Sequence, residues 1–261
     1  MEKHIFAICA YGESPYLEEC ILSLKAQTVK SNIILATATP NEHIKELCNR
    51  YELPLFINNG EHGITQDWNF ALSRADAEYV TIAHQDDVYC PNYLEEVLKQ
   101  LAFAKRPIIA FSDYGELRNG MHVDNNKLLK IKRALLLPLR TKLLWNRIWV
   151  RRRVLSLGSP ICCPSVTFVK SNCPDVIFQH RYRADEDWEA WEMLSKRKGA
   201  FVFCNEILMY HRIHEESETS KILEDNGRTW EDLEMFSKFW PYPIAKVITK
   251  LYGTSEKSNK L

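Results

Sequence analysis

Two acidic clusters, distant along the chain, carry residue types that could do chemistry on a charged substrate. The first follows the apolar run 79–83 and consists of His84, Gln85, Asp86 and Asp87. Adjacent carboxylates at the end of a buried strand resist joint ionisation unless a cation compensates their charge. A hard divalent cation with oxygen ligands would do so, and it would also bind a substrate diphosphate. Two interpretations follow: a metal site, or a solvated turn in which one aspartate caps the next helix.

The second cluster is Asp185, Glu186 and Asp187, and it precedes Trp188 and Trp191 at helical spacing. Acids at the start of a helix complement the helix dipole, and that role needs no substrate. A carboxylate within ~3 Å of a substrate hydroxyl would instead act as a general base. The sequence leaves both roles open.

A third polar group closes the apolar run 201–210. Arg212 and His214 alternate with Ile213, so an extended backbone directs both side chains to one face. On that face they could meet a phosphate or a metal together. The alternative is an exposed polar strand end.

The elements that must position these residues alternate between strand and helix. Short apolar runs predict strands over 4–10, 33–38, 53–57, 79–83 and 108–112. Capping residues and helical periodicity predict helices from Ser14 and from Thr39, a helix over 64–74 and another from Pro91. This order predicts an α/β fold whose mostly parallel sheet is covered by helices on both faces.

Residues just beyond the carboxyl ends of such strands converge on one crevice, where ligands of these sheets bind. Here they are Tyr11, residues 37–39, Asn58, Asn59 and residues 84–87. Neither G-x-G-x-x-G nor G-x-x-x-x-G-K occurs, which disfavours dehydrogenases and P-loop enzymes.

The composition of the 261 residues, 46% hydrophobic and 26% charged, is that of one or two globular domains. No apolar run approaches the ~20 residues of a bilayer span. The apolar run 5–10 is too short for a secretory leader, so we expect a cytoplasmic protein. The eight cysteines lack C-x-x-C spacing, which favours buried free thiols over a zinc site.

Charge is unevenly distributed, although 34 basic and 34 acidic residues cancel. Residues 127–174 hold 11 basic and no acidic side chains. By contrast, residues 1–126 hold 10 basic and 18 acidic side chains, and residues 175–261 hold 13 basic and 16 acidic ones. In segment 127–157 the basic residues interleave with leucine, isoleucine and tryptophan. This predicts an amphipathic helix on an anionic membrane, with Arg151–Arg153 contributing to binding. The alternatives are a nucleic-acid patch, which the acidic flanks disfavour, and packing against the core or a partner subunit.

Four segments resemble, in order and spacing, the family 2 glycosyltransferases with the GT-A fold. They are YGESPYLEECILSLKAQT at 11–28, YVTIAHQDDVYCP at 79–91, DEDWEAW at 185–191 and YHRIHEESET at 210–219. The resemblance implies a Rossmann-like, mostly parallel sheet flanked by helices. It also implies an enzyme that moves a sugar from a nucleotide diphosphate donor, a UDP-sugar by preference, to an acceptor hydroxyl. Transfer is expected to invert the anomeric carbon and to use Mn²⁺ or Mg²⁺.

The resemblance also implies roles for individual residues. The D-x-D motif of the family falls on His84, Gln85 and Asp86, so histidine replaces the first acid. Asp187, beside Glu186, matches the catalytic base. The expected donor-binding residues include Thr39, which lies beyond the second strand. The full set is Tyr11, Glu13, Thr39, Asp67, Asn69, His84, Gln85, Asp86, Arg212 and His214. The expected metal ligands are Asp86, Asp87 and His214.

We expect one catalytic domain over residues 1–225, with a nucleotide-binding half over 1–112 and an acceptor half over 113–225. A helical tail follows over 226–261. The expected acceptor is a saccharide, lipid-linked and met at the inner face of the membrane during surface polysaccharide assembly. A homo-oligomer is compatible with the sequence, and nucleic acid is not expected as a partner.

Two other functions stay open at this point. A metal-dependent nucleotidyltransferase or diphosphate hydrolase could use the same acids at 86 and 87 but would not need Asp187. A catalytically silent nucleotide-sugar binder is the other alternative, because His84 stands where the family has an acid.

Overall fold

The computed structural model describes the backbone of residues 2–214 and 228–257, and the side chains of residues 2–214 and 229–253. Residues 215–219 of the fourth family segment, and the end of the predicted tail from residue 258, lie outside this part of the chain.

One mixed sheet organises the described residues. Its strands are β1 (Glu2–Ala10), β2 (Asn32–Thr37), β3 (Leu55–Ile57), β4 (Ala77–His84), β5 (Val88–Tyr89), β6 (Pro107–Arg118), β7 (Met121–Val123), β8 (Val166–Val169) and β9 (Ala200–Ile213). They follow the order β3-β2-β1-β4-β8-β6-β9-β5, with β7 paired to β6. The half formed by β3, β2, β1 and β4 is parallel, as predicted. The other half is mixed, because β8 runs antiparallel to both β4 and β6, while β6 and β9 are parallel.

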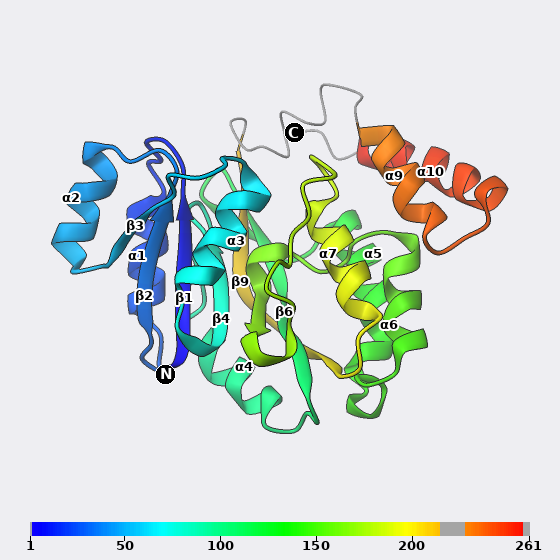
Figure 1. The fold of residues 1–261 in the computed structure, drawn as a ribbon. Helices are drawn as coiled ribbons and strands as arrows, with labels where there is room; N and C mark the ends of the chain where they lie inside the picture. Colours follow the sequence, from blue (N-terminus) through cyan, green and yellow to red (C-terminus); the bar gives the residue numbers. More distant parts are fainter. Residues whose placement is uncertain (1, 215–227, 258–261) are drawn as a thin grey trace.

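Helices cover the sheet and extend the molecule at one edge (Figure 1). They are α1 (Leu17–Lys25), α2 (Glu42–Tyr51), α3 (Ile64–Arg74), α4 (Tyr93–Leu101), α5 (Lys127–Leu136), α6 (Ile148–Val154), α7 (Glu186–Ser195), α9 (Arg228–Ser237) and α10 (Tyr242–Lys257). α3 packs on β1, β2 and β4, and α4 packs on β6 and β9. In Figure 1, α9 and α10 form the outer edge beyond α5, α6 and α7.

The caps of two helices differ from those predicted. α1 begins at Leu17, beyond the expected start at Ser14. α2 is capped by Asn41, whose side chain accepts a hydrogen bond from the N–H of Ile44 at 2.9 Å, rather than by Thr39. Asparagine is among the best capping residues, so the local chemistry is equivalent. The Thr39 hydroxyl is consequently available to the loop after β1.

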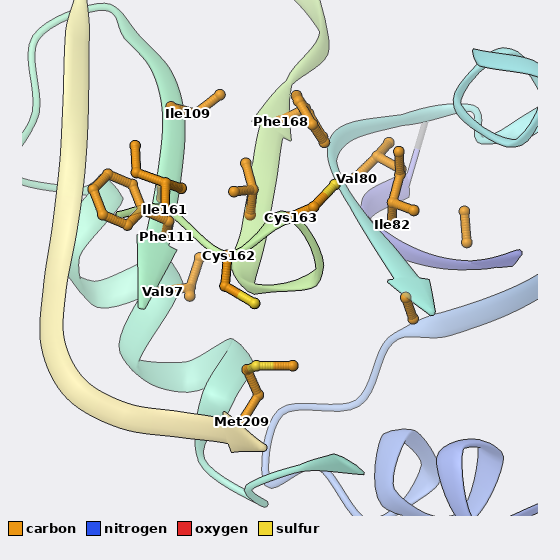
Figure 2. Packing of buried hydrophobic residues seen from close by; sticks show 14 of the residues in the cluster. Val80, Ile82, Val97, Ile109, Phe111, Ile161, Cys162, Cys163, Phe168 and Met209 are labelled. Carbon is orange, nitrogen blue, oxygen red and sulfur yellow. The ribbon is translucent and has the colours of Figure 1, made fainter. Parts of the chain in front are cut away.

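The core surrounds the central strands, whose side chains are buried on both faces. Figure 2 shows its packing around Cys162 and Cys163, with Val80, Ile82, Ile109, Phe111, Phe168 and Met209. Burial on both faces explains why the central strands have near-continuous apolar sequences. All eight cysteines are free and five of them are buried, which confirms the predicted thiols.

The basic segment 127–157 contains two separate helices, α5 and α6, joined by short 3₁₀ turns, rather than one helix lying on a membrane. Arg151 in α6 is 0% exposed. Its guanidinium donates hydrogen bonds to the backbone carbonyls of Ser195, Arg197 and Gly199. The predicted membrane contact is therefore wrong for Arg151, because a side chain without exposed surface cannot reach lipid headgroups.

The next two arginines also bind protein. Arg152 bonds Glu192 of α7 at 2.7 Å, and Arg153 lies over the ring of Trp240 at 4.8 Å. They join α6 to α7 and to the connection between α9 and α10, so for Arg151, Arg152 and Arg153 the structure supports packing against the core. No helix in the described ranges is both long and apolar enough to cross a bilayer.

We expect Arg151→Met to lower the free energy of unfolding by about 3 kcal/mol, because three backbone carbonyls would lose the donor that the buried guanidinium provides. Arg140→Met changes an exposed arginine of the same segment and should stay within about 0.5 kcal/mol of the parent protein. Urea denaturation followed by circular dichroism measures both. Equal denaturation midpoints for the two variants would contradict this role of Arg151.

Candidate active site

The carboxyl ends of β1 and β4 bring the first loops of the site together. These strands are parallel neighbours, with Cys9 opposite His84. Just beyond them, the side chain of Gln85 accepts a hydrogen bond from the N–H of Tyr11 and donates one to its C=O, both at 3.0 Å. The Tyr11 side chain is 67% exposed. An aromatic ring with a fixed main chain therefore projects from the strand ends, where it could stack on a flat ligand.

The loop after β1 is also tied to the end of β2. Gly12 donates its N–H to Thr39 Oγ1 and accepts from Asn41 Nδ2, both at 2.8 Å. Its φ of 61° is a left-handed conformation that favours glycine. Glu13 follows and is exposed. Thr39 thus orders the loop that carries Glu13, and direct contact of either residue with a donor stays a prediction.

A buried carboxylate joins the end of β4 to the end of β9. Asp87 is 1% exposed, and its Oδ1 lies 2.9 Å from the N–H nitrogen of Arg212 and 3.0 Å from His211 Nδ1. Its other oxygen lies 4.0 Å from His84 Nδ1. Asp87 is therefore engaged within the protein, and Asp86 is the acid that solvent reaches.

The titratable groups around Asp87 divide into an ion pair and a neutral ring. Burial opposes ionisation of Asp87, but the charge and hydrogen bond of His211 outweigh it and hold the pKa of Asp87 below its ordinary value. Burial likewise opposes protonation of His211, yet Asp87 raises its pKa. For His84 burial dominates over the attraction of Asp87 and Asp86, so its pKa is lowered. His84 stacks on Trp68 of α3, with ring centres 5.0 Å apart and planes 16° from parallel.

Asp86 and His214 form a partly exposed pair beside Asp87. Asp86 Oδ2 lies 3.0 Å from His214 Nε2, and the two side chains are 24% and 21% exposed. Arg212 holds the main chain of this pair, since its Nε donates to the C=O of Asp86 at 2.7 Å. The guanidinium also bonds Glu19 and lies 4.2 Å from the ring centre of Tyr16. Arg212 thus positions the junction of β4, β9 and α1, and its direct contact with a donor stays a prediction.

Two predicted donor-site residues of α3 have different surroundings. Asp67 Oδ1 accepts a hydrogen bond from Asn58 Nδ2 at 2.7 Å, which links it to the loop after β3. Asn69 donates to the C=O of Phe178 at 2.7 Å and accepts from its N–H at 3.1 Å. Asp67 therefore lies with the strand-end loops, whereas Asn69 tethers the segment that leads to α7.

The start of α7 carries the second acidic cluster. Asp185 and Glu186 are 1% and 7% exposed, and Asp187 is half-buried. Glu231 of α9 accepts hydrogen bonds from the backbone N–H groups of residues 183–185 at 2.8 to 3.3 Å. A carboxylate from another helix therefore fixes the position of this cluster.

An acid from each cluster acts on one buried thiol, that of Cys162 in the loop before β8. Burial raises the pKa of this thiol, the charge of Lys132 opposes the rise, and the charges of Asp87 and Asp187 add to it. An acid just after β4 and an acid at the start of α7 therefore both contribute to the electrostatic environment of Cys162.

Several residues that shape this site have no role predicted from the sequence. His211 had a usable signal, because strand alternation turns it away from the face that Arg212 and His214 share. Glu231 and Lys132 had none, since their contacts depend on how distant helices pack.

Comparisons with known proteins bear on this fold and site. The model of the family described as "Glycosyl transferase family 2" matches residues 5–156. Among solved structures, S. aureus TarS 1-349 in complex with UDP-GlcNAc is similar with a TM-score of 0.62 and 14% identity, covering 100% of this chain and 74% of that chain. The mannosyltransferase PcManGT from Pyrobaculum calidifontis, in complex with GDP-Man and Mn²⁺, has a TM-score of 0.63 and 12% identity, covering 99% and 76%. Comparison with curated protein sequences finds no match.

The fold is that of the GT-A glycosyltransferases, as predicted. The family model spans more than half of the chain. The chain therefore belongs to glycosyl transferase family 2 and is a glycosyltransferase.

We expect His211→Gln to destabilise the protein more at about pH 6 than at about pH 9. Asp87 raises the pKa of His211 above its ordinary value of 6.5 in the folded protein. The ion pair therefore contributes its full stabilisation below pH 6.5, and this contribution is lost as the pH rises through the pKa of the folded protein. Asp87 stays ionised over this range, because its pKa is lowered. Urea denaturation at the two pH values measures the difference. His62→Gln, at an exposed site, is the control, and a pH-independent effect of His211→Gln would refute the ion pair.

Proposed function

We propose that this family 2 glycosyltransferase transfers a sugar from a UDP-sugar to a hydroxyl of a saccharide acceptor, with inversion at the anomeric carbon. Two acidic groups on different elements carry the proposal. Asp86 pairs with His214 at the ends of β4 and β9, their side-chain atoms 3.0 Å apart, and Asp187 lies at the start of α7. The charges of Asp187 and of Asp87, the neighbour of Asp86, both act on the buried thiol of Cys162. A donor between the two acidic groups would direct its diphosphate toward the first group and its sugar toward the second. Likeness to TarS, solved with UDP-GlcNAc, supports the choice of nucleotide.

The pair of Asp86 and His214 fits a divalent cation. A carboxylate oxygen and an imidazole nitrogen 3.0 Å apart, both partly exposed, form a donor set that Mn²⁺ accepts. Within the described ranges no cluster of three or more His, Cys, Asp or Glu makes a complete site, so diphosphate oxygens and water would supply the other ligands. The similar mannosyltransferase was solved with Mn²⁺. When bound, Mn²⁺ or Mg²⁺ would neutralise charge on the departing diphosphate. Asp87 would support Asp86 rather than bind the cation itself.

The reaction also needs a base on the side of the sugar opposite the diphosphate. Asp187 would accept the proton of the acceptor hydroxyl while that oxygen attacks the anomeric carbon. Displacement from this side inverts the centre in one step, without a covalent sugar intermediate. Glu186, buried next to it, would help to orient the acceptor, and the anchored start of α7 would keep Asp187 at a constant distance from the sugar.

The nucleoside would lie over the ends of β1 and β2. The exposed ring of Tyr11 is placed to stack on the base, and the loop of Glu13 and Thr39 borders the same edge. His84 Nε2 is buried and has no hydrogen-bond partner among the described residues. A buried polar atom without a partner is costly, so a ribose hydroxyl is its proposed partner. Histidine would thereby contact the ribose from the position of the family's first acid, without that acid's charge.

The acceptor is proposed to be a lipid-linked saccharide of surface polysaccharide assembly, reached at the inner face of the membrane. In this proposal residues 1–112 bind the nucleotide and residues 113–225 bind the acceptor. Support for a membrane location comes from large apolar side chains on the surface of the basic segment, where Leu143 and Trp149 are 85% and 67% exposed. A homo-oligomer stays a prediction.

We expect Asp187→Asn to lower kcat by about a thousandfold while binding of a UDP-sugar stays near the parental level, because a general base acts only on the acceptor. Transfer is followed by UDP release, and donor binding by isothermal titration calorimetry. Asp175→Asn, at an exposed site before α7, is the matched control. Unchanged turnover of the donor in Asp187→Asn would favour a nucleotidyltransferase or diphosphate hydrolase instead.

Asp86→Ala and His214→Ala should each abolish the increase in donor affinity caused by Mn²⁺, since each removes one ligand of the proposed cation. The measurement is a thermal-shift titration of a UDP-sugar with Mn²⁺ or with EDTA, because a ligand of the folded state raises its melting temperature. Asp76→Ala, at the amino end of β4, is the control. A Mn²⁺ effect that survives in both site variants would refute the assignment.

A further inference from the structure

The outward face of α10 carries an apolar stripe. Ile244, Val247 and Leu251 are 47%, 60% and 65% exposed. Their spacing of three and four residues places them on one side of the helix. Lys246 and Lys250 are also exposed and flank the stripe. The helix therefore presents aliphatic side chains and ammonium groups to the surroundings.

A different face of the same helix is packed against the protein. Ala245 and Thr249 are 0% and 6% exposed. The ring of Tyr252 lies 5.4 Å from that of Phe236 in α9. The position of α10 is thus fixed by its buried face, and the apolar stripe is additional to what that packing requires.

The charged side chains that the structure describes on α10 are of one sign. Residues 242–253 contain two lysines and no aspartate or glutamate. In Figure 1, α10 lies at the outer edge of the molecule, toward the end at which β1 and β9 also terminate. A surface that bound α10 would therefore lie on the side of the molecule where the strand-end site opens.

We infer that α10 docks on an anionic membrane, with Ile244, Val247 and Leu251 inserted among the acyl chains and Lys246 and Lys250 at the headgroups. Helices of this kind gain from apolar burial and from attraction to anionic lipids together. A second copy of the chain would explain the apolar stripe but not the lysines, because a twofold contact along the stripe would bring like charges together. The inference deepens the proposed membrane location and replaces Arg151 as its contact. It does not depend on the proposed chemistry.

The test is flotation of the full chain with phosphatidylcholine vesicles, with or without phosphatidylglycerol. The double variant Val247→Gln/Leu251→Gln should reduce partitioning onto the anionic vesicles by about tenfold or more. Gln keeps helix propensity, and both sites are exposed, so the fold is retained. Leu22→Gln in α1, where Leu22 is 49% exposed, is the matched control and should bind like the parent.

The lysines are tested separately. Lys246→Gln/Lys250→Gln should weaken binding about fivefold per lysine on phosphatidylglycerol vesicles and should leave binding to pure phosphatidylcholine unchanged. Parental binding by the Val247/Leu251 variant would overturn the inference. The inference would also be overturned if the parent chain did not float with vesicles but formed a dimer in light scattering, and if the Val247/Leu251 variant dissociated that dimer. Transfer to a water-soluble acceptor should be parental in both variants, which separates failure of this surface from failure of the proposed chemistry.

Discussion

The geometry of the site depends on one buried carboxylate. Asp87, with 1% of its surface exposed, binds the His211 ring and the N–H of Arg212, and so holds the end of β4 against the end of β9. Without these partners a buried charge would cost several kcal/mol, so the two strand ends are held in this register. Asp86 consequently pairs with His214 and stays partly exposed. The two adjacent acids therefore differ in role: Asp87 organises the protein, and Asp86 is accessible to solvent.

The other side of the site is fixed by long-range contacts of a similar kind. Glu231 of α9 binds the backbone at the start of α7, and Arg151 binds the carbonyl of its last residue, Ser195, and that of Gly199 beyond it. α7 is therefore held at both ends by charged groups from other helices. These contacts at both ends of α7 fix the position of the proposed base Asp187. The helices beyond the sheet therefore affect the proposed chemistry at the strand ends of the sheet.

Much of the fold follows from local sequence signals. The apolar runs and capping residues before residue 112 predict the parallel half of the sheet, and the D-x-D-like motif and the acids before Trp188 predict the two clusters. β8 was missed because Val166–Val169 is only four residues long and pairs antiparallel between β4 and β6. The role of Arg151 was misjudged because three acceptors some forty residues away, invisible to periodicity, decide whether its charge is buried.

The central claim is that a single displacement takes place between Asp86 with His214 on one side and Asp187 on the other. The most direct measurement is the anomeric configuration of the first-formed product, followed by proton NMR before mutarotation or further reaction. A single displacement gives a product whose anomeric configuration is opposite to that of the nucleotide-sugar donor. A product that retains the donor configuration would contradict it.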